Sequence, residues 1–260
     1  MNDYTTKIII YGCFGRMGTA ISNLVIDMPD IEVVAGFDVV RSRETRSYPV
    51  SYNINDYPMP ADVVLNFLPT SETEASIALL QYCADKKMPM VIGTTNLPHI
   101  VLEAIASVSK KIAIFQAPNL AIGVNLFANI IENAAKQLFD AGFDIEIVEK
   151  HHNKKLDAPS GTAIMLSETI NRTLGGNMHM QTDRSFQQGE RERIEMGIHS
   201  IRGGSITGEH SVIFAGHGET IEFTHRAESR DVFALGAIKA AQFIQGKPAG
   251  MYNMKDLLNA

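Results

Sequence analysis

The sequence predicts an α/β protein: a Rossmann-type parallel-sheet nucleotide domain, and a second α+β domain with a mixed, largely open sheet. Three observations carry this prediction. Short β-branched runs alternate with helical patterns up to about residue 121, a glycine-rich loop follows the first run, and the pattern changes near Gly123. Strands that alternate with helices indicate a parallel sheet covered on both faces.

The first domain begins with a predicted buried strand over residues 7–11, and its first predicted helix spans 19–28. Further strands are expected at 32–37, 62–67, 89–92 and 112–115, and further helices at 72–86 and 97–110.

The second domain begins with a long predicted helix over 124–141 and a strand over 143–147, in which apolar and acidic residues alternate. The polar stretch 178–195 is predicted to be a loop, and the runs 211–215 and 220–224 predict a hairpin. An apolar helix over 232–244 closes the pattern. We therefore place the nucleotide domain at 1–121 and 231–260, and the second domain at 122–230.

The composition is that of an ordinary globular protein, with 260 residues, 45% of them hydrophobic and 20% charged. The net charge of −6 argues against a nucleic-acid or membrane-surface partner, because no broad basic face is available. Two cysteines, Cys13 and Cys83, are too few for a disulfide framework or a zinc site. We therefore expect a cytoplasmic protein without a metal.

The loop Gly12-Cys13-Phe14-Gly15-Arg16-Met17-Gly18 follows the first predicted strand and leads into the first helix. Glycines there let the backbone turn tightly and approach a pyrophosphate, whose charge the helix N-terminus stabilises. A plain strand–helix turn is the alternative. Asp38 favours the nucleotide interpretation, because an acid at the end of the second strand can bind the ribose hydroxyls.

Asp38 also favours NADH over NADPH, since a 2′-phosphate would face its carboxylate. Arg41 and Arg43 lie just beyond and could accept that phosphate, although a solvated loop is the better interpretation for at least one of them. The sequence therefore predicts NADH use with NADPH tolerated.

The stretch 149–163, Glu-Lys-His-His-Asn-Lys-Lys-Leu-Asp-Ala-Pro-Ser-Gly-Thr-Ala, concentrates the chemistry. A metal site is disfavoured, because adjacent histidines in a strand point to opposite faces and no third ligand is evident. One histidine at a strand end beside solvated lysines is the structural alternative. In an active site, His151 or His152 could exchange a proton near neutral pH and Lys155 would add positive charge.

A helix is expected to begin near Pro159, with Asp157 as its cap and an apolar face that starts at Ala163. The N–H groups of Ser160, Gly161 and Thr162 would then be left for an anion. A nucleotide domain and a cationic, proton-donating pocket together suit hydride transfer to an unsaturated anionic substrate, followed by protonation.

These residues resemble the signature of the 4-hydroxy-tetrahydrodipicolinate reductase (dihydrodipicolinate reductase) family, which reduces its substrate in the diaminopimelate route to lysine. Further matches lie in order along nearly the whole chain: 12–18, 91–95, 117–119 with 123–125, 200–204 with 208–210, and 224–227 with 229–230. Two rivals remain. An amino-acid dehydrogenase should lack the 151–162 run, and a non-catalytic sensor of NAD(P)H would need no proton donor.

The resemblance implies roles for individual residues. His151 matches the catalytic histidine and Lys155 the proton donor, while His152, Ser160, Gly161 and Thr162 match positions that bind a small dicarboxylate substrate. The matching cofactor positions are Gly12, Cys13, Phe14, Gly15, Arg16, Met17, Asp38, Gly93, Thr94, Thr95, Ala117, Pro118, Asn119 and Leu120. A homotetramer formed through sheets of the second domain is also implied. If both histidines serve one pocket, the strand before them should end ahead of His151.

Four positions depart from the family pattern. Val39 stands where some members carry an arginine that helps to bind NADPH, and Asn96 stands where glycine is common. Asn66 and Leu68 alter a more usual Asp-Phe-Thr or Asp-Phe-Ser start. These differences concern the cofactor pocket and leave the proton-transfer residues unchanged.

Overall fold

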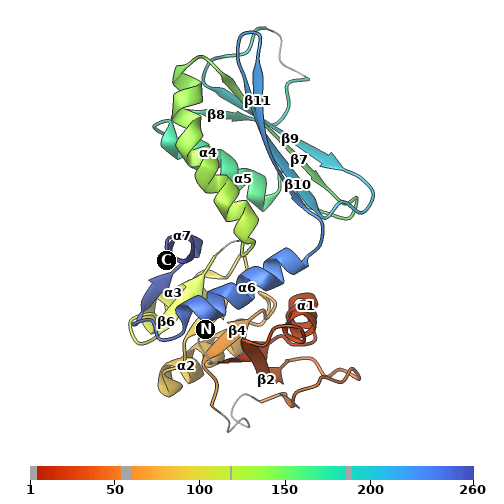
Figure 1. The fold of residues 1–260 in the computed structure, drawn as a ribbon, viewed down its shortest axis with the longest axis vertical. Coiled ribbons are helices and arrows are strands. Elements are labelled where there is room, and N and C mark those ends of the chain that lie inside the picture. The colour runs from red at the N-terminus through yellow and green to blue at the C-terminus, as the bar shows by residue number, and fades with distance from the viewer. Residues whose placement is uncertain (1–4, 54–59, 118, 186–188) are drawn as a thin grey trace. The chain divides into compact units, whose positions relative to one another are not determined.

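The computed structural model describes residues 5–53, 60–117, 119–185 and 189–260. The chain divides into two compact units, of which the first comprises residues 1–122 and 231–260 and the second comprises residues 123–230. The first contains a parallel sheet flanked by helices and the second a mixed sheet, so the predicted fold class is confirmed (Figure 1).

The first unit has a seven-stranded sheet in the order β12-β6-β5-β4-β1-β2-β3, and every neighbouring pair is parallel. The strands are β1 (Thr6–Tyr11), β2 (Ile31–Phe37), β3 (Val50–Ser51), β4 (Val63–Asn66), β5 (Met90–Ile92), β6 (Ala113–Gln116) and β12 (Gly250–Tyr252). Strand order reverses beside β1, which is where open α/β sheets bind ligands at the carboxyl ends of their strands.

Helices cover both faces of this sheet. One core joins α1 (Arg16–Val25) and α6 (Asp231–Ile244) to side chains such as Ile8 and Ile10. The other joins α2 (Thr73–Lys86) and α3 (His99–Val108) to Ile9 and its neighbours on the opposite face. Because both faces are buried, β1 is an almost continuous apolar run. A short helix, α7 (Met254–Leu258), follows β12.

The second unit has a five-stranded sheet in the order β11-β10-β7-β9-β8. Its strands are β7 (Asp144–His151), β8 (His179–Gln181), β9 (Glu195–Arg202), β10 (Gly208–Ala215) and β11 (Thr220–Ala227). The β11–β10 and β10–β7 pairs are antiparallel, while β7–β9 and β9–β8 are parallel. Helices α4 (Ile122–Asp140) and α5 (Gly161–Thr173) contribute Ile131 and Leu166 to the core over one sheet face (Figure 1).

Two features of the second unit differ from the sequence prediction. The stretch 178–195, predicted to be a loop, contains β8 and ends at the first residue of β9, and β9 itself was not predicted. The expected strand over 143–147 continues to His151. The predicted hairpin is confirmed, and its strands β10 and β11 are longer than expected.

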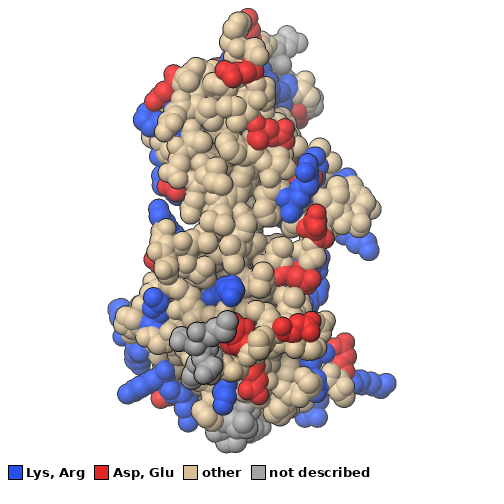
Figure 2. All heavy atoms as spheres, in the orientation of Figure 1, with Lys and Arg blue, Asp and Glu red and all other residues tan. Residues whose placement is uncertain are grey.

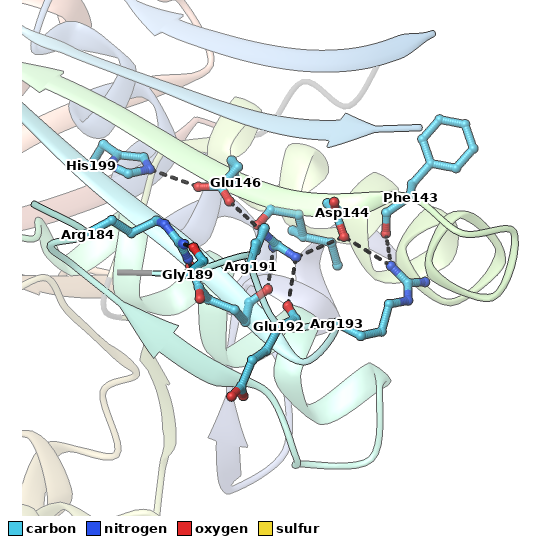
Figure 3. A network of polar contacts seen from close by, with 11 residues as sticks. Phe143, Asp144, Glu146, Arg184, Gly189, Arg191, Glu192, Arg193 and His199 are labelled. Carbon is cyan, nitrogen blue, oxygen red and sulfur yellow. Dashed lines mark hydrogen bonds and ion pairs between the residues drawn. The ribbon is translucent and has the colours of Figure 1, made fainter. Parts of the chain in front are cut away.

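Arg191 fastens the segment before β9 to strand β7 (Figure 3). Its guanidinium donates to Asp144 Oδ1 at 2.9 Å, to Glu146 Oε1 at 3.1 Å and to the carbonyl of Ile145 at 2.9 Å. Glu146 also lies 2.8 Å from Nε2 of His199 on β9. A planar guanidinium can satisfy several acceptors at once, so one side chain holds this segment against the beginning of β7, the central strand of the sheet.

Acidic and basic side chains are interspersed on the face drawn in Figure 2, and neither sign covers it continuously. Within the described residues, no helix is long and apolar enough to cross a membrane.

Candidate active site

The glycine-rich loop connects β1 to α1 through close backbone contacts. Gly12 has a φ of +87°, and a Cβ there would lie 2.9 Å from the carbonyl oxygen of Phe67. A Cβ at Gly18 would lie 2.4 Å from the Gly12 carbonyl oxygen. Gly15 is the N-cap of α1 and gives the helix no side-chain cap. The first N–H groups of α1 are therefore suited to a phosphate.

Asp38 follows β2 and braces this loop. Its Oδ2 accepts a hydrogen bond from the N–H of Phe14 at 2.9 Å, and its Oδ1 accepts one from Val40 at 3.1 Å. Arg46 lies on the other side of the loop, where it donates to the Cys13 carbonyl oxygen and stacks over the Phe14 ring. The sequence analysis did not single out Arg46. The one sequence signal for Arg46 as a site residue is a basic side chain that follows the second predicted strand.

A cavity of about 470 Å³ brings together six of the expected cofactor residues, all of which line its wall: Gly15, Arg16, Met17, Gly93, Thr94 and Thr95. They come from two loops at the carboxyl ends of β1 and β5. A second cavity of about 530 Å³ shares Thr94 and Thr95 and includes Ala117.

The other expected cofactor residues take different places. Cys13 is fully buried, and burial raises the pKa of its thiol to about 11, so it is a packing residue. The side chain of Asn119 accepts a hydrogen bond from the N–H of Ala121 at 2.8 Å. Leu120 packs in the core beneath α6, and Pro118 lies outside the described residues.

Two of the departures from the family pattern have a structural explanation. Asn96 has a φ of +54°, a left-handed conformation that glycine adopts freely and asparagine tolerates better than most residues. Asn66 is buried, and its Oδ1 accepts a hydrogen bond from the Leu68 N–H at 3.0 Å. The amide thus performs the turn-forming role that a carboxylate could also perform at this position.

The second group of site residues begins on β7, where buried and partly exposed side chains alternate strictly. His151 is the last residue of the strand, so the expectation that the strand ends before it is wrong. The backbone of His151 pairs with that of Arg202 in β9, which is the last pair between these two strands. His152 follows the strand, and within the described part of the chain its buried Nδ1 has no hydrogen-bond partner.

Glu149 is fully buried on the same face of β7 as His151. Its carboxylate accepts two hydrogen bonds of 2.7 Å from Arg202, and its Oε2 lies 2.6 Å from Nδ1 of His151. Burial alone would raise the pKa of Glu149. The hydrogen bonds from Arg202, Ser200 and His151 outweigh it and lower that pKa to about 2. Burial lowers the pKa of His151, although Glu149 opposes this effect.

Helix α5 begins at Gly161, two residues after the expected start at Pro159, and has a different cap. Ser160 is the N-cap, and its Oγ accepts a hydrogen bond from the N–H of Ala163 at 3.2 Å. The expectation that Asp157 caps the helix is wrong, because its carboxylate pairs with Lys155 instead. The Ser160 N–H donates to Glu149 at 3.1 Å, so it is not left for an anion as expected.

The remaining site residues lie around this helix start. Ser160 Oγ is 3.0 Å from Nε2 of His210, a histidine that packs edge-on against His151 with ring centroids 5.1 Å apart. Burial lowers the pKa of His210 to about 4, so the ring is neutral at pH 7. A Cβ at Gly161 would meet no atom within 4 Å, which leaves space for a ligand.

Sequence reasoning assigned no roles to Glu149, Arg202 and His210, although it singled out the segments that contain them. The signal for Glu149 is its position on the apolar face of β7, in line with Ile145 and Ile147. A carboxylate at such a position requires buried cationic or N–H partners. Within the described residues, no three histidine, cysteine or carboxylate side chains gather in a way that could hold a metal ion.

Comparison with known proteins gives matches along nearly the full length. Residues 6–120 match the family model described as Dihydrodipicolinate reductase, N-terminus, and residues 123–258 match Dihydrodipicolinate reductase, C-terminus. The 4-hydroxy-tetrahydrodipicolinate reductase of Clostridium tetani is 45% identical over 98% of this chain and 97% of its own length. The enzyme of the same name from Clostridium novyi is 44% identical over 98% and 99% of the two chains.

Two solved structures share the fold. The dipicolinate-bound dihydrodipicolinate reductase from Paenisporosarcina sp. TG-14 has a TM-score of 0.77 at 24% identity, covering 96% of this chain and 97% of its own. A diaminopimelate (DAP) dehydrogenase from C. glutamicum, in complex with DAP, has a TM-score of 0.56 at 16% identity, covering 98% and 93%.

Proposed function

The chain belongs to the dihydrodipicolinate reductase family, and we propose how its residues perform the reduction that this membership assigns to it. It is an oxidoreductase of lysine and diaminopimelate biosynthesis that converts 4-hydroxy-tetrahydrodipicolinate to tetrahydrodipicolinate. The reaction takes up one hydride and one proton and releases one water. The segment 151–163 is the observation that supports our residue assignment best, because it joins two candidate proton carriers to a helix start.

The first unit fits a nicotinamide cofactor. No side chain caps α1. The lining of the cavity beside it includes Gly15 and Gly93, which have no side chains to keep a ligand from the backbone. We assign the pyrophosphate to the N–H groups at the start of α1, the ribose to Asp38, and the nicotinamide to the wall formed by Gly93, Thr94 and Thr95. When bound, the cofactor supplies the hydride.

NADH is the preferred cofactor in this proposal, and NADPH is tolerated. Asp38 accepts hydrogen bonds from Phe14 of the glycine-rich loop and from Val40, and a 2′-phosphate bound beside it would meet its negative charge. Arg41 lies over the ring of Tyr52, with its guanidinium carbon 5.3 Å from the centroid, and Arg46 is turned toward the glycine-rich loop. These cations offset part of the repulsion, which is why we propose tolerance rather than exclusion of NADPH.

Lys155 and His151 carry the proton chemistry in this proposal. The side chain of Lys155 is 21% exposed on the loop before α5, where a substrate can reach it, and its Nζ donates the proton that the reduction requires. His151 is held through Nδ1 by Glu149, so its Nε2 is the nitrogen that can relay a proton or stabilise developing charge.

The substrate carboxylate binds at the start of α5. We assign the carboxylate to the backbone of the first turn, at Gly161 and Thr162, because the space around Gly161 permits close approach. His152 contributes its unpartnered Nδ1. Ser160 is 2% exposed, and we assign it the role of fixing the helix start rather than of touching the ligand.

A coupled assay tests the function. The purified protein is mixed with NADH, pyruvate, aspartate semialdehyde and the synthase that precedes it in the route, and the absorbance of NADH is followed. We expect oxidation that depends on the synthase and on both carbon substrates. NADH oxidation that continues without the synthase, or none with it, would contradict the assignment.

We also propose a homotetramer formed through the face of the second unit's sheet opposite α4 and α5. Part-exposed residues of β7 and β10, among them Val148 and Ile213, lie on this face. Light scattering should give four times the chain mass of 28.5 kDa. A charge at Ile213 (Ile213→Glu) should lower that mass, and an unchanged tetramer would place the interface elsewhere.

A further inference from the structure

Glu149 occupies a position where a charge is costly. The inward face of β7 carries Ile145, Ile147, Glu149 and His151, and the Glu149 side chain is 0% exposed. An isolated buried carboxylate would be strongly disfavoured. The residue is therefore held there by specific partners, and those partners indicate what it does.

The partners of Glu149 come from three different elements. Arg202 of β9 binds it bidentately at 2.7 Å, the N–H of Ser160 at the start of α5 donates to Oε1 at 3.1 Å, and His151 Nδ1 lies 2.6 Å from Oε2. Arg202 alone neutralises the carboxylate charge. His151 is therefore not needed as a counter-ion, and its bond to Glu149 can serve another purpose.

That purpose follows from the chemistry of the two groups. An ionised carboxylate only accepts hydrogen bonds, so the hydrogen of the neutral His151 ring must lie on Nδ1. The lone pair is then on Nε2, at the opposite edge of the ring. A Cβ on Gly208 would lie 3.2 Å from Nε2, so the absence of a side chain at this position keeps that edge uncrowded.

We propose that Glu149 is a positioning residue for the reduction: it fixes the tautomer and orientation of His151 and anchors the substrate-binding start of α5 to the same carboxylate. This inference rests on the proposed function, since it assigns His151 and the helix start to one reaction. One carboxylate thus sets the distance between the proton-transfer histidine and the backbone that receives the substrate's charge.

The charged and titratable groups that face His151 come from four places. They are Glu149 on β7, Arg202 on β9, His210 on β10 and Lys155 on the loop before α5. Glu149 is the only anion among these four, and the positive charges of Arg202 and Lys155 favour a neutral ring. Removing the charge of Glu149 should therefore make His151 harder to protonate.

The variant Glu149→Gln keeps the shape and removes the charge. Its amide can present an N–H to Nδ1 of His151, which forces the ring hydrogen to Nε2. We expect kcat to fall about tenfold to hundredfold, as for loss of a group that orients a catalytic ligand, with little change in KM for NADH. The pH-profile limb that depends on His151 should move to lower pH by about one unit.

Glu209→Gln is the matched control. Glu209 is also a carboxylate of the second unit in a double ion pair, and within the described residues its ion-pair partners are Lys150 and Arg226 rather than His151 or Ser160. We expect its kcat and pH profile to resemble those of the wild type. An equal loss in both variants would mean that any paired carboxylate of this sheet matters, and would overturn the proposal.

Glu149→Gln leaves Arg202 without its anion, so the fold itself could suffer. The double variant Glu149→Gln/Arg202→Gln removes both charges and serves as the second test. If Glu149 only neutralises Arg202, this double variant should recover wild-type kcat, and the proposal fails. If Glu149 positions His151, kcat stays low in a folded protein.

Long-range ¹H–¹⁵N NMR spectra of the imidazole rings give a readout that does not depend on activity. The wild-type His151, identified by its loss in His151→Gln, should carry its hydrogen on Nδ1, and the Glu149→Gln variant should not. An unchanged tautomer overturns the inference. A wild-type protein without synthase-dependent NADH oxidation would instead refute the proposed function, while the spectra would still decide the role of Glu149.

Discussion

Lys155 Nζ lies 2.8 Å from Asp157 Oδ1, two positions further along the loop between β7 and α5. The Asp157 side chain is 59% exposed and the Lys155 side chain is 21% exposed. An ion pair this open to solvent is worth at most about 1 kcal/mol. In the proposed mechanism, the dicarboxylate substrate can therefore displace Asp157 from Lys155 at little cost.

Replacement of Lys155 by alanine should lower kcat by about a hundredfold or more, because the proposed proton donor is lost. The dissociation constant for NADH should stay within about twofold, since the glycine-rich loop belongs to the other unit. Steady-state kinetics in the coupled assay and NADH fluorescence titration measure the two quantities. The neighbouring exposed lysine supplies the control, Lys154→Ala, with activity close to wild type. Wild-type turnover in Lys155→Ala would remove Lys155 from the mechanism.

Cofactor preference should respond to a cation beside Asp38. Val39 is 38% exposed directly after Asp38, and Val39→Arg would place a guanidinium where a 2′-phosphate would lie. We expect the wild type to have the higher kcat/KM with NADH, and the variant to gain about tenfold with NADPH. Ile26→Arg, an equally cationic change at an exposed site near the end of α1, should leave both values unaltered. A wild-type enzyme that strongly prefers NADPH would refute this part of the proposal.

His210 should make the protein less stable as the pH falls from 6.5 to 4. Its pKa is about 4 in the folded protein and 6.5 as a free side chain, so in this range the unfolded chain binds a proton that the folded chain does not. The free energy of unfolding should fall by up to about 1.4 kcal/mol per pH unit from this group. Above pH 6.5 the His210 ring is neutral in both the folded and the unfolded chain, so this group no longer lowers the free energy of unfolding.

Urea unfolding of the wild type and His210→Gln at several pH values between 4 and 7 measures that slope. The free energy of unfolding of the variant should depend less steeply on pH than that of the wild type. The slope that remains in the variant comes from the other titrating groups. His217→Gln, in the exposed turn between β10 and β11, should keep the wild-type slope. If His210→Gln keeps it too, His210 is not the source of the acid sensitivity.

Arg191→Lys should destabilise the second unit by about 1–3 kcal/mol, because a lysine cannot satisfy Asp144, Glu146 and the Ile145 carbonyl together. Calorimetry should show a transition lowered by several degrees, with kcat nearly unchanged. Arg226→Lys is the comparison, since Arg226 is 67% exposed and should cost less than about 0.5 kcal/mol. If the two variants lose equal amounts of unfolding free energy, the hydrogen bonds of Arg191 contribute no more to stability than an exposed ion pair does.

In the first unit the other strands and helices followed the sequence prediction, while β3, β12 and α7 were not predicted; the second unit followed it only in part. Buried runs such as Ile8 to Ile10 identify central parallel strands by composition alone. Strands β8 and β9 escaped prediction because their residues include glycine, histidine and charged side chains. In β9, Glu195 pairs with Arg184 and His199 pairs with Glu146 of β7, and no local pattern reveals these tertiary partners.

The same limit applies to the site. The chain pattern pointed to the 151–163 segment, and the structure places His151, Lys155 and Ser160 around the beginning of α5. The cap at Ser160 rather than Asp157 depends on Glu149 and His210, which pull Ser160 inward from two other strands. Competing caps three residues apart cannot be ranked from local sequence, since either could accept the N–H bond.

The first unit is assembled from two separate stretches of chain, and this has a consequence during synthesis on the ribosome. Residues 123–230 form one continuous unit and can fold as soon as they emerge. The sheet that starts with β1 must wait for residues 231–260, because α6 covers one of its faces and β12 completes its edge. A nascent chain released early would therefore keep an intact second unit and expose an apolar sheet face, which marks it for chaperones and proteases.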